Sequence, residues 1–203
     1  MEFIILIVLF LTFSALVAYF GSAGHKGKRG EAIVNRYARR LLDPDEYHLI
    51  EDVTLETRNG TTQIDHIVIS IYGIFVIETK NLSGWIFGNE RQRTWTQVIY
   101  KNKYKFQNPL RQNYAHVKTL QSLLKLKNNQ IHSVVAFVGD CLFKTDMPEN
   151  VTYGKEFIYH IKSMLVPVLT ELEVEKVINT INDKRLERST KTDRAHVRNL
   201  RNN

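Results

Sequence analysis

The fold of this chain is decided by residues 64–80, which read IDHIVISIYGIFVIETK. Two apolar segments flank a short turn at Ile71-Tyr72, and side chains alternate between the two faces of a strand. A hairpin folded about this turn has opposed side chains whose Cβ atoms lie roughly 4.5–5.5 Å apart. The sequence therefore predicts three opposed pairs: Ile69 with Ile74, Ile67 with Val76, and Asp65 with Glu78.

Acidic residues stand at one end of this apolar face. Asp65 and Glu78 are expected to lie close together, and Lys80 follows on the same face as Glu78. Two carboxylates in apolar surroundings are unfavourable unless a cation lies between them. We therefore predict a site for Mg²⁺ (or Mn²⁺) on Asp65 and Glu78, with the carbonyl of Thr79 as a further oxygen ligand. The alternative is a surface hairpin end at which Lys80 forms a salt bridge with the acids.

Composition limits the class of protein. The chain has 203 residues, a formal net charge of +7 and a single cysteine. This length suits one domain with a hydrophobic core plus appendages. The single cysteine, Cys141, excludes a disulfide framework or a cysteine-rich zinc finger within this chain, and we expect it to be a small buried residue. The sequence has no Gly-rich phosphate loop, which argues against a kinase or a nucleotidase.

The N-terminal segment predicts a membrane anchor. Residues 3–20 are apolar apart from Thr12 and Ser14, and a helix of that length spans about 27 Å of a hydrocarbon core of about 30 Å. A cleaved signal peptide is the alternative, but no Lys or Arg precedes the apolar run. Basic residues follow it, so the positive-inside rule predicts a single-pass protein of the cell membrane with its C-terminal domain in the cytoplasm. Anionic lipid is expected near Lys26, Lys28 and Arg29.

Three parts are expected in the chain: an anchor and linker (1–24), a globular domain (25–187) and a basic flexible tail (188–203). Within the domain, hydrophobic periodicity and capping signals predict helices and strands in mixed order, with Asn108 as the cap of one helix and a capping box at Thr170 and Glu173 opening another. The expected helices cover residues 28–42, 109–127, 155–164 and 171–187, and the expected strands cover 47–57, 62–80 as a hairpin, 85–87, 94–100, 131–138 and 151–153. This order indicates an α/β fold with one mixed central sheet flanked by helices.

Several motifs agree with a known family. They are GKRGE (27–31), QIDHIVI (63–69), GIFVIETKN (73–81), GWIFG (84–88), Trp95 and NPLRQ (108–112). In this order they resemble the nuclease-related domain, NERD, over roughly residues 27–138. The resemblance implies a restriction-endonuclease-like fold of the PD-(D/E)xK superfamily and a magnesium-dependent nuclease connected with DNA processing. It assigns site roles to Glu31, Asp65, Glu78, Lys80 and Gln112.

The residues themselves suggest how such a site would work. Lys80 would orient the attacking water or stabilise charge on the phosphate, and we favour the electrostatic role. Glu31 lies at the edge of the helix face that meets the sheet, where it would be a third metal-binding acid; the alternative is a solvated first-turn glutamate. His66 is expected to be a packing residue. Gln112 and His116, one helical turn apart, line either the cleft or an ordinary polar helix face.

The basic residues are unevenly distributed. Residues 91–139 contain nine Lys and Arg and no Asp or Glu. Their spacing of two on an extended segment and of seven on a helix puts them on common faces, which favours a nucleic-acid-binding surface. Its expected members are Lys101, Lys103, Lys105, Arg111, Lys118 and Lys125. Edge-strand lysines that block aggregation and ordinary solvated helix charge are the alternatives. Trp85 and Trp95 are expected to lie in the core or to cover a sheet rather than to stack on bases.

These observations lead to one functional prediction and its rivals. We expect a membrane-tethered, metal-dependent nuclease that hydrolyses phosphodiester bonds of nucleic acid, with DNA as the first candidate. One alternative is a non-catalytic module that binds nucleic acid or a protein complex at the membrane. The other is a scaffold whose basic residues face anionic headgroups.

Overall fold

The structure is a computed structural model that describes residues 23–58 and 60–187. The predicted membrane anchor at residues 3–20 and the predicted tail at 188–203 lie outside these residues. Within the two described ranges, no helix is both long enough and apolar enough to cross a bilayer.

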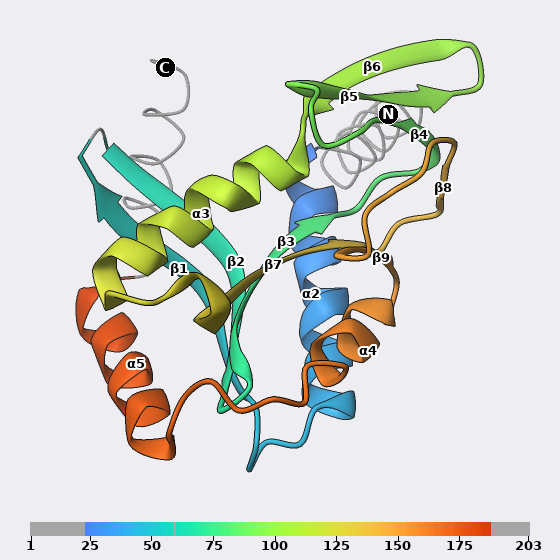
Figure 1. The fold of residues 1–203 in the computed structure, drawn as a ribbon. Helices are drawn as coiled ribbons and strands as arrows, with labels where there is room; N and C mark the ends of the chain where they lie inside the picture. The colour runs from blue at the N-terminus through green and yellow to red at the C-terminus, as the bar shows by residue number, and fades with distance from the viewer. Residues whose placement is uncertain (1–22, 59, 188–203) are drawn as a thin grey trace, which may run out of the picture.

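A five-stranded mixed sheet forms the centre of the fold, as predicted (Figure 1). The first three strands of the order β1-β2-β3-β7-β9 are antiparallel, and β3, β7 and β9 run parallel. The parallel pairs place the C-terminal ends of β3 and β7 at the same edge of the sheet. The bounds are β1 His48–Thr57, β2 Gly60–Ser70, β3 Gly73–Lys80, β7 Ile131–Phe137 and β9 Val151–Tyr153.

The hairpin of β2 and β3 has the predicted register. Ile69 pairs with Ile74 and Ile67 with Val76, but the pairing of β2 with β3 ends at His66 and Ile77, so the third predicted pair, Asp65 with Glu78, is not part of it. The turn is closed by the pair of Ser70 and Gly73, and Gly73 has a φ of +135°, which a side chain would oppose. The predicted turn is therefore confirmed.

Two pairs of helices cover the central sheet (Figure 1). Helices α2 (Ala23–Leu41) and α4 (Glu156–Lys162) pack on one face, and α3 (Pro109–Leu124) and α5 (Glu171–Lys184) on the other, with a short 3₁₀ helix at Asn128–Gln130. The side chain of Asn108 caps α3, as predicted, by accepting a hydrogen bond from the backbone of Leu110. Helix α3 ends at Leu124 rather than at the predicted residue 127, because Lys125 has a left-handed φ of 54°.

A second sheet, which the sequence did not separate from the first, lies beside the end of β3. Its strand order is β6-β5-β4-β8, with β4 at Gly84–Phe87, β5 at Thr94–Ile99, β6 at Asn102–Gln107 and β8 at Cys141–Phe143. Trp95 is fully buried and stacks on Phe137 of β7, with ring centroids 6.2 Å apart. The expectation for Trp95 is confirmed, but Trp85 is 51% exposed and does not belong to the core.

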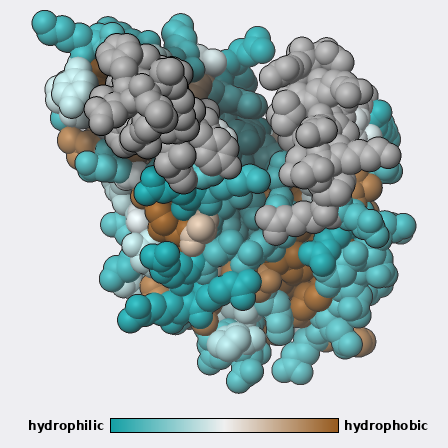
Figure 2. Space-filling model, turned by 180° about the vertical axis from the view of Figure 1, so that it is seen from behind, coloured by the Kyte–Doolittle hydropathy of each residue, from teal (hydrophilic) through white to brown (hydrophobic). Residues whose placement is uncertain are grey.

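The outside of the domain is mostly polar. Seen from behind, its surface is largely hydrophilic, with small apolar areas separated from one another (Figure 2). Cys141 is partly exposed rather than buried as expected, and its free thiol has a pKa raised to about 11 by burial and by Asp140. Such a thiol is unreactive at neutral pH.

Candidate active site at the end of strand β3

Helix α2 comes unusually close to the end of β3. A Cβ atom at Gly30 would lie 2.7 Å from Cβ of Asn81 and 3.2 Å from Cγ2 of Thr79. Only glycine therefore fits at this crossing. The side chain of Asn81 donates a hydrogen bond of 2.7 Å to the carbonyl of Lys26 and fixes the helix there. This approach brings the next residue, Glu31, to the candidate site.

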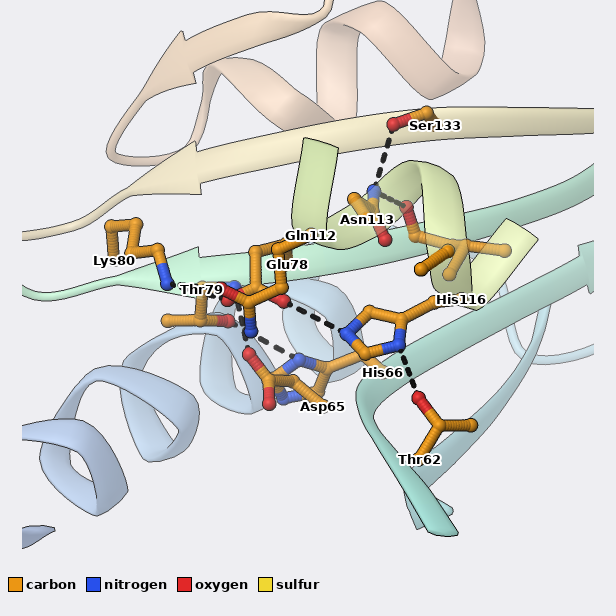
Figure 3. A network of polar contacts seen from close by, with 12 residues as sticks. Thr62, Asp65, His66, Glu78, Thr79, Lys80, Gln112, Asn113, His116 and Ser133 are labelled. Atoms are coloured by element: carbon orange, nitrogen blue, oxygen red, sulfur yellow. Dashed lines mark hydrogen bonds and ion pairs between the residues drawn. The ribbon is translucent and has the colours of Figure 1, made fainter. Parts of the chain in front are cut away.

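Asp65 lies at the wall of the site, partly buried. Its Oδ2 accepts a hydrogen bond of 2.8 Å from the backbone N–H of Thr79 (Figure 3). Burial raises the pKa of Asp65 well above its ordinary value, and the negative charges of Glu78 and Glu31 raise it further. The charges of the other two predicted acids, Glu78 and Glu31, thus act on the carboxyl group of Asp65.

Glu78 is almost fully buried, with 2% of its surface exposed. Its Oε1 accepts a charged hydrogen bond of 2.7 Å from Nζ of Lys80, and its Oε2 lies 3.3 Å from Nε2 of His116 without hydrogen-bond geometry. Burial alone would raise the pKa of Glu78, but Lys80 and His116 outweigh burial and hold that pKa below its ordinary value. The two carboxyl groups are therefore shifted in opposite directions, since the pKa of Glu78 is lowered and that of Asp65 is raised.

The ammonium group of Lys80 is held between two elements. Besides Glu78 it contacts Gln112 in the first turns of α3, with Nζ donating to Oε1 at 3.0 Å (Figure 3). The side chain of Lys80 is 18% exposed, so its charge remains within reach of a ligand from solvent. Gln112, which the family resemblance suggested, thus touches the Glu-x-Lys motif directly.

His116 connects α3 to two strands. It is buried, and its Nδ1 lies 2.7 Å from Oγ1 of Thr62 on β2 while its Nε2 faces Glu78. When the Thr62 hydroxyl donates to Nδ1, the ring carries its proton on Nε2, directed at the Glu78 carboxylate. His116 is therefore not part of an ordinary solvated polar helix face, since it is buried against Thr62 and Glu78.

His66 is fully buried behind the site, with Nδ1 3.4 Å from the Thr79 hydroxyl. Burial lowers its pKa to about 4, although Glu51 and the backbone of Glu31 act in the opposite direction. A neutral imidazole in this place is a packing residue, as expected.

The sequence did not single out Asn113, which positions α3. Asn113 is fully buried, and its Nδ2 lies 2.8 Å from the carbonyl of Val76, 3.0 Å from that of Val134 and 2.9 Å from the hydroxyl of Ser133. These contacts fix the helix over the junction of β3 and β7. The side chains of Gln112 and His116 are thereby directed at the site. The only sign of this role in the sequence was that Asn113 is a polar residue on the apolar side of the helix, seven residues before Leu120.

The donor chemistry of the site suits a hard cation. The Oε2 atom of Glu78 is buried without a hydrogen bond, and Asp65 faces its negative charge. Within residues 23–58 and 60–187, however, no three His, Cys, Asp or Glu side chains are arranged to hold one ion. The protein ligands available are thus two carboxylates and the Thr79 carbonyl. Mg²⁺ accepts such a set, because it retains several waters and uses few protein ligands.

The predicted basic residues fall into two groups. Lys103 and Lys105 lie exposed on β6, with Lys101 in the turn before it, and Arg111 lines a hollow together with Lys105. Arg93, which the sequence did not single out as a site residue, lines the same hollow.

The second group lies further along α3. Lys118 donates to Gln121 at 2.8 Å and stands over the ring of Tyr114, while Lys125 has left the helix at its C-cap. The predicted helical stripe of Arg111, Lys118 and Lys125 is therefore incomplete. Only Arg111 of the three lies in the turns of α3 that reach Lys80.

Comparison with known proteins agrees with the motifs. The sequence model of the nuclease-related domain, NERD, matches residues 26–138. An uncharacterized protein of Bacillus anthracis is 42% identical over 161 residues, which cover 77% of this chain and 75% of that protein. No solved structure matches the chain significantly. The matched region contains all of the proposed acids, Lys80 and Gln112.

Proposed function

The chain belongs to the nuclease-related domain family, within the restriction-endonuclease-like superfamily, and from this premise we propose that it hydrolyses phosphodiester bonds of nucleic acid, with DNA as the first substrate. The observation that carries the proposal is the contact of a buried, ionised Glu78 with Lys80, which Gln112 holds in turn. An ammonium group fixed at a partly open position favours polarising a phosphate group, and the carboxylate beside it is a hard oxygen ligand for a divalent cation.

Each residue has a task in this proposal. Asp65 and Glu78 would hold Mg²⁺ or Mn²⁺ together with the carbonyl of Thr79, and Glu31, whose charge acts on Asp65, would add a third negative charge near the ion. When bound, the ion would neutralise charge on the phosphate and activate a water molecule. Lys80 would direct its ammonium group at the phosphate or at the attacking water, and it favours charge development there because it is already oriented.

The other residues of the network act on these side chains. Gln112 accepts from Lys80 and keeps its ammonium group from turning fully toward Glu78. His116 lies behind Glu78, with its Nε2 3.3 Å from Oε2 of that carboxylate, and Thr62 fixes the ring through Nδ1. Gln112, His116 and Thr62 are thus positioning residues. Mutation of such supporting residues in metal sites typically lowers activity or metal affinity about 10–100-fold.

The test is a cleavage assay with the full chain in mild detergent. Labelled single-stranded, duplex and branched DNA are incubated with Mg²⁺ or Mn²⁺, and the Glu78→Gln variant is compared with Glu56→Gln, which changes an exposed glutamate of β1. We expect EDTA-sensitive cleavage that Glu56→Gln retains and Glu78→Gln loses. Intact substrate in every case, from a protein that melts cooperatively, would rule out catalysis.

A second candidate function is binding without cleavage, favoured by the exposed lysines on β6. Salt-sensitive DNA binding that is unchanged by EDTA and by Asp65→Asn, with no cleavage, would support it.

The proposal also retains the membrane tether. Residues 3–20 would anchor the chain in the cell membrane with the nuclease domain in the cytoplasm, and Lys26, Lys28 and Arg29 would meet anionic lipid. Vesicle flotation of the full chain and of a chain lacking residues 3–20 would test this.

A further inference from the structure

The four-stranded sheet has two unlike faces. Ile86 and Trp95 belong to its inner face and pack against Phe137 of the central sheet. Because side chains alternate along a strand, the neighbours of these residues lie on the outer face. One cross-strand row on that face runs Leu142, Trp85, Val98, Lys103, and the next runs Phe87, Thr96, Lys105.

The outer face combines an exposed aromatic ring with positive charge. Trp85 and Leu142 are 51% and 50% exposed, and Lys103 and Lys105 are exposed as well. The Nζ atom of Lys144 stands 4.6 Å from the centre of the Trp85 ring. Trp85 and Leu142 are paired across β4 and β8, so their exposed apolar surfaces are contiguous, and a contiguous exposed apolar patch indicates a binding surface.

Two hollows continue this face toward the candidate active site. Lys105 and Arg93 line both of them. One hollow, of about 350 Å³, also contains Phe87 and Thr96 of the outer face. The other, of about 510 Å³, extends to Arg111. Positively charged side chains therefore follow one another from the sheet to the first turn of α3.

That turn leads directly to the catalytic lysine. Arg111 precedes Gln112, whose Oε1 accepts the hydrogen bond from Lys80. The second sheet also follows β3 directly in the chain, since β4 begins four residues after Lys80. Arg111 of the second hollow thus lies in the same turn of α3 as the residue that contacts Lys80.

We infer that the outer face of the four-stranded sheet binds single-stranded nucleic acid, with a base stacked on Trp85 and phosphates along Lys103, Lys105, Arg93 and Arg111 toward Lys80. The inference rests on the proposed function, because it names the form of the substrate for the same site. A half-exposed aromatic ring on a sheet, flanked by basic side chains, is the arrangement that binds unpaired bases. Bases in a duplex are already stacked on one another and offer no free ring face to Trp85.

The two tryptophans allow a direct measurement of stacking. Trp95 is buried, so quenching of intrinsic fluorescence by an oligonucleotide reports on Trp85. The full chain in mild detergent with EDTA is titrated with a 20-nucleotide oligothymidine, with its duplex with oligoadenosine, and with an abasic strand of equal phosphate number. We expect quenching and tight binding with the oligothymidine only. The abasic strand should bind roughly 5–150-fold more weakly, which is the affinity contributed by stacking one base.

A matched pair of variants separates stacking on Trp85 from the general effect of removing an exposed aromatic ring. Trp85→Ala should weaken oligothymidine binding by the same roughly 5–150-fold, measured by fluorescence anisotropy of a labelled strand, and Trp85→Phe should restore most of it. Tyr159→Ala is the control, because Tyr159 is also an exposed aromatic, 58% exposed, with Lys155 over its ring, but lies on α4. It should bind like the unchanged chain.

Equal affinity of the Trp85→Ala chain and the unchanged chain for oligothymidine would overturn the inference, as would equal binding of the abasic strand or the duplex. Failure of the proposed function looks different. If oligothymidine binds through Trp85 but no substrate is cleaved with Mg²⁺ or Mn²⁺, the inference holds and catalysis is refuted. If cleavage occurs and the Trp85→Ala chain cleaves single strands at unchanged KM, catalysis holds and this surface is refuted.

Discussion

The end of strand β3 and the outer face of the four-stranded sheet both carry lysines, but they hold them in opposite ways. Lys80 is mostly buried and bonded to Glu78 and Gln112. Lys103 and Lys105 lie exposed on an edge strand. A fixed charge in a region of low dielectric can polarise a phosphate group, whereas an exposed charge is screened by salt and contributes to binding. If the proposed function holds, the first region would act on the bound phosphate and the second would bind the nucleic acid.

The largest effect is expected from removing the fixed charge. Lys80→Met should lower the cleavage rate by about 10²–10³-fold, because a preoriented positive group at the phosphate is lost. Lys176→Met, an exposed lysine of α5, should leave the rate unchanged. The measurement is single-turnover cleavage at saturating Mg²⁺, with thermal melting as a check of folding. An unaltered rate in the Lys80→Met chain would remove the contrast between the two regions.

The buried region should also make stability depend on pH. The pKa of His66 falls from 6.5 to about 4 on folding, so the unfolded chain binds a proton that the folded chain rejects. Stability from this group is present above pH 6.5 and is lost as the pH falls toward 4, by on the order of 3 kcal/mol. Denaturant unfolding of the unchanged chain and of His66→Gln at several pH values measures the difference.

The control for this effect is His48→Gln, which changes an exposed histidine on β1. Its pH dependence should follow that of the unchanged chain. Asp65 acts in the opposite direction, because its raised pKa stabilises the folded state as the pH falls, but its contribution is common to all three proteins. Parallel curves for the His66→Gln chain and the unchanged chain would show that burial of this imidazole has no energetic consequence.

A smaller effect is expected from the contact that links the two regions. Gln112→Ala removes the side chain that holds Lys80 from α3, and kcat should fall by about 10–100-fold with little change in KM. Gln121→Ala, in the same helix and bonded to Lys118, is the control. A rise in KM at constant kcat would assign Gln112 to substrate binding. It would contradict the proposed separation between a reacting region at the end of β3 and a binding region on the four-stranded sheet.

The smallest effect concerns the exposed charges. Lys103→Gln with Lys105→Gln should reduce the slope of log K against log salt for single-stranded DNA by about 1.4, since each phosphate contact contributes about 0.7. Lys155→Gln with Lys176→Gln should not change the slope. An equal slope in all three proteins, measured by anisotropy between 50 and 300 mM salt, would contradict a recruiting role for β6.

The hairpin could be predicted from the sequence because the residues that determine its register are close together in the chain. The turn at Ile71-Tyr72 and the strict alternation around it set the pairs of Ile69 with Ile74 and of Ile67 with Val76, and both are observed. The cap at Asn108 and the capping box at Thr170 are equally local and are also observed.

The prediction from sequence fails where contacts between residues far apart in the chain determine the local structure. Alternation predicts that Ile64 and Ile67 face opposite sides, yet both belong to the core cluster under α3 and α5, so the phase of β2 changes near Asp65. The neighbouring strand contains Asp52 with a left-handed φ of 54°. The carboxylate of Asp65 consequently meets the backbone of Thr79. The contacts of Asn113 and the exposure of Trp85 depend likewise on packing between elements, which a single strand or helix pattern does not encode.

The central claim is that Asp65 and Glu78 hold one divalent cation, and binding of Mn²⁺ followed by electron paramagnetic resonance tests it most directly. The full chain should bind Mn²⁺ in competition with Mg²⁺, with an affinity that rises with pH, because a carboxyl group must lose its proton to bind the ion and burial raises the pKa of Asp65. Asp65→Asn and Glu78→Gln should each weaken binding by at least about 10-fold, and Glu56→Gln should not. Equal Mn²⁺ affinity in all four proteins would contradict the account.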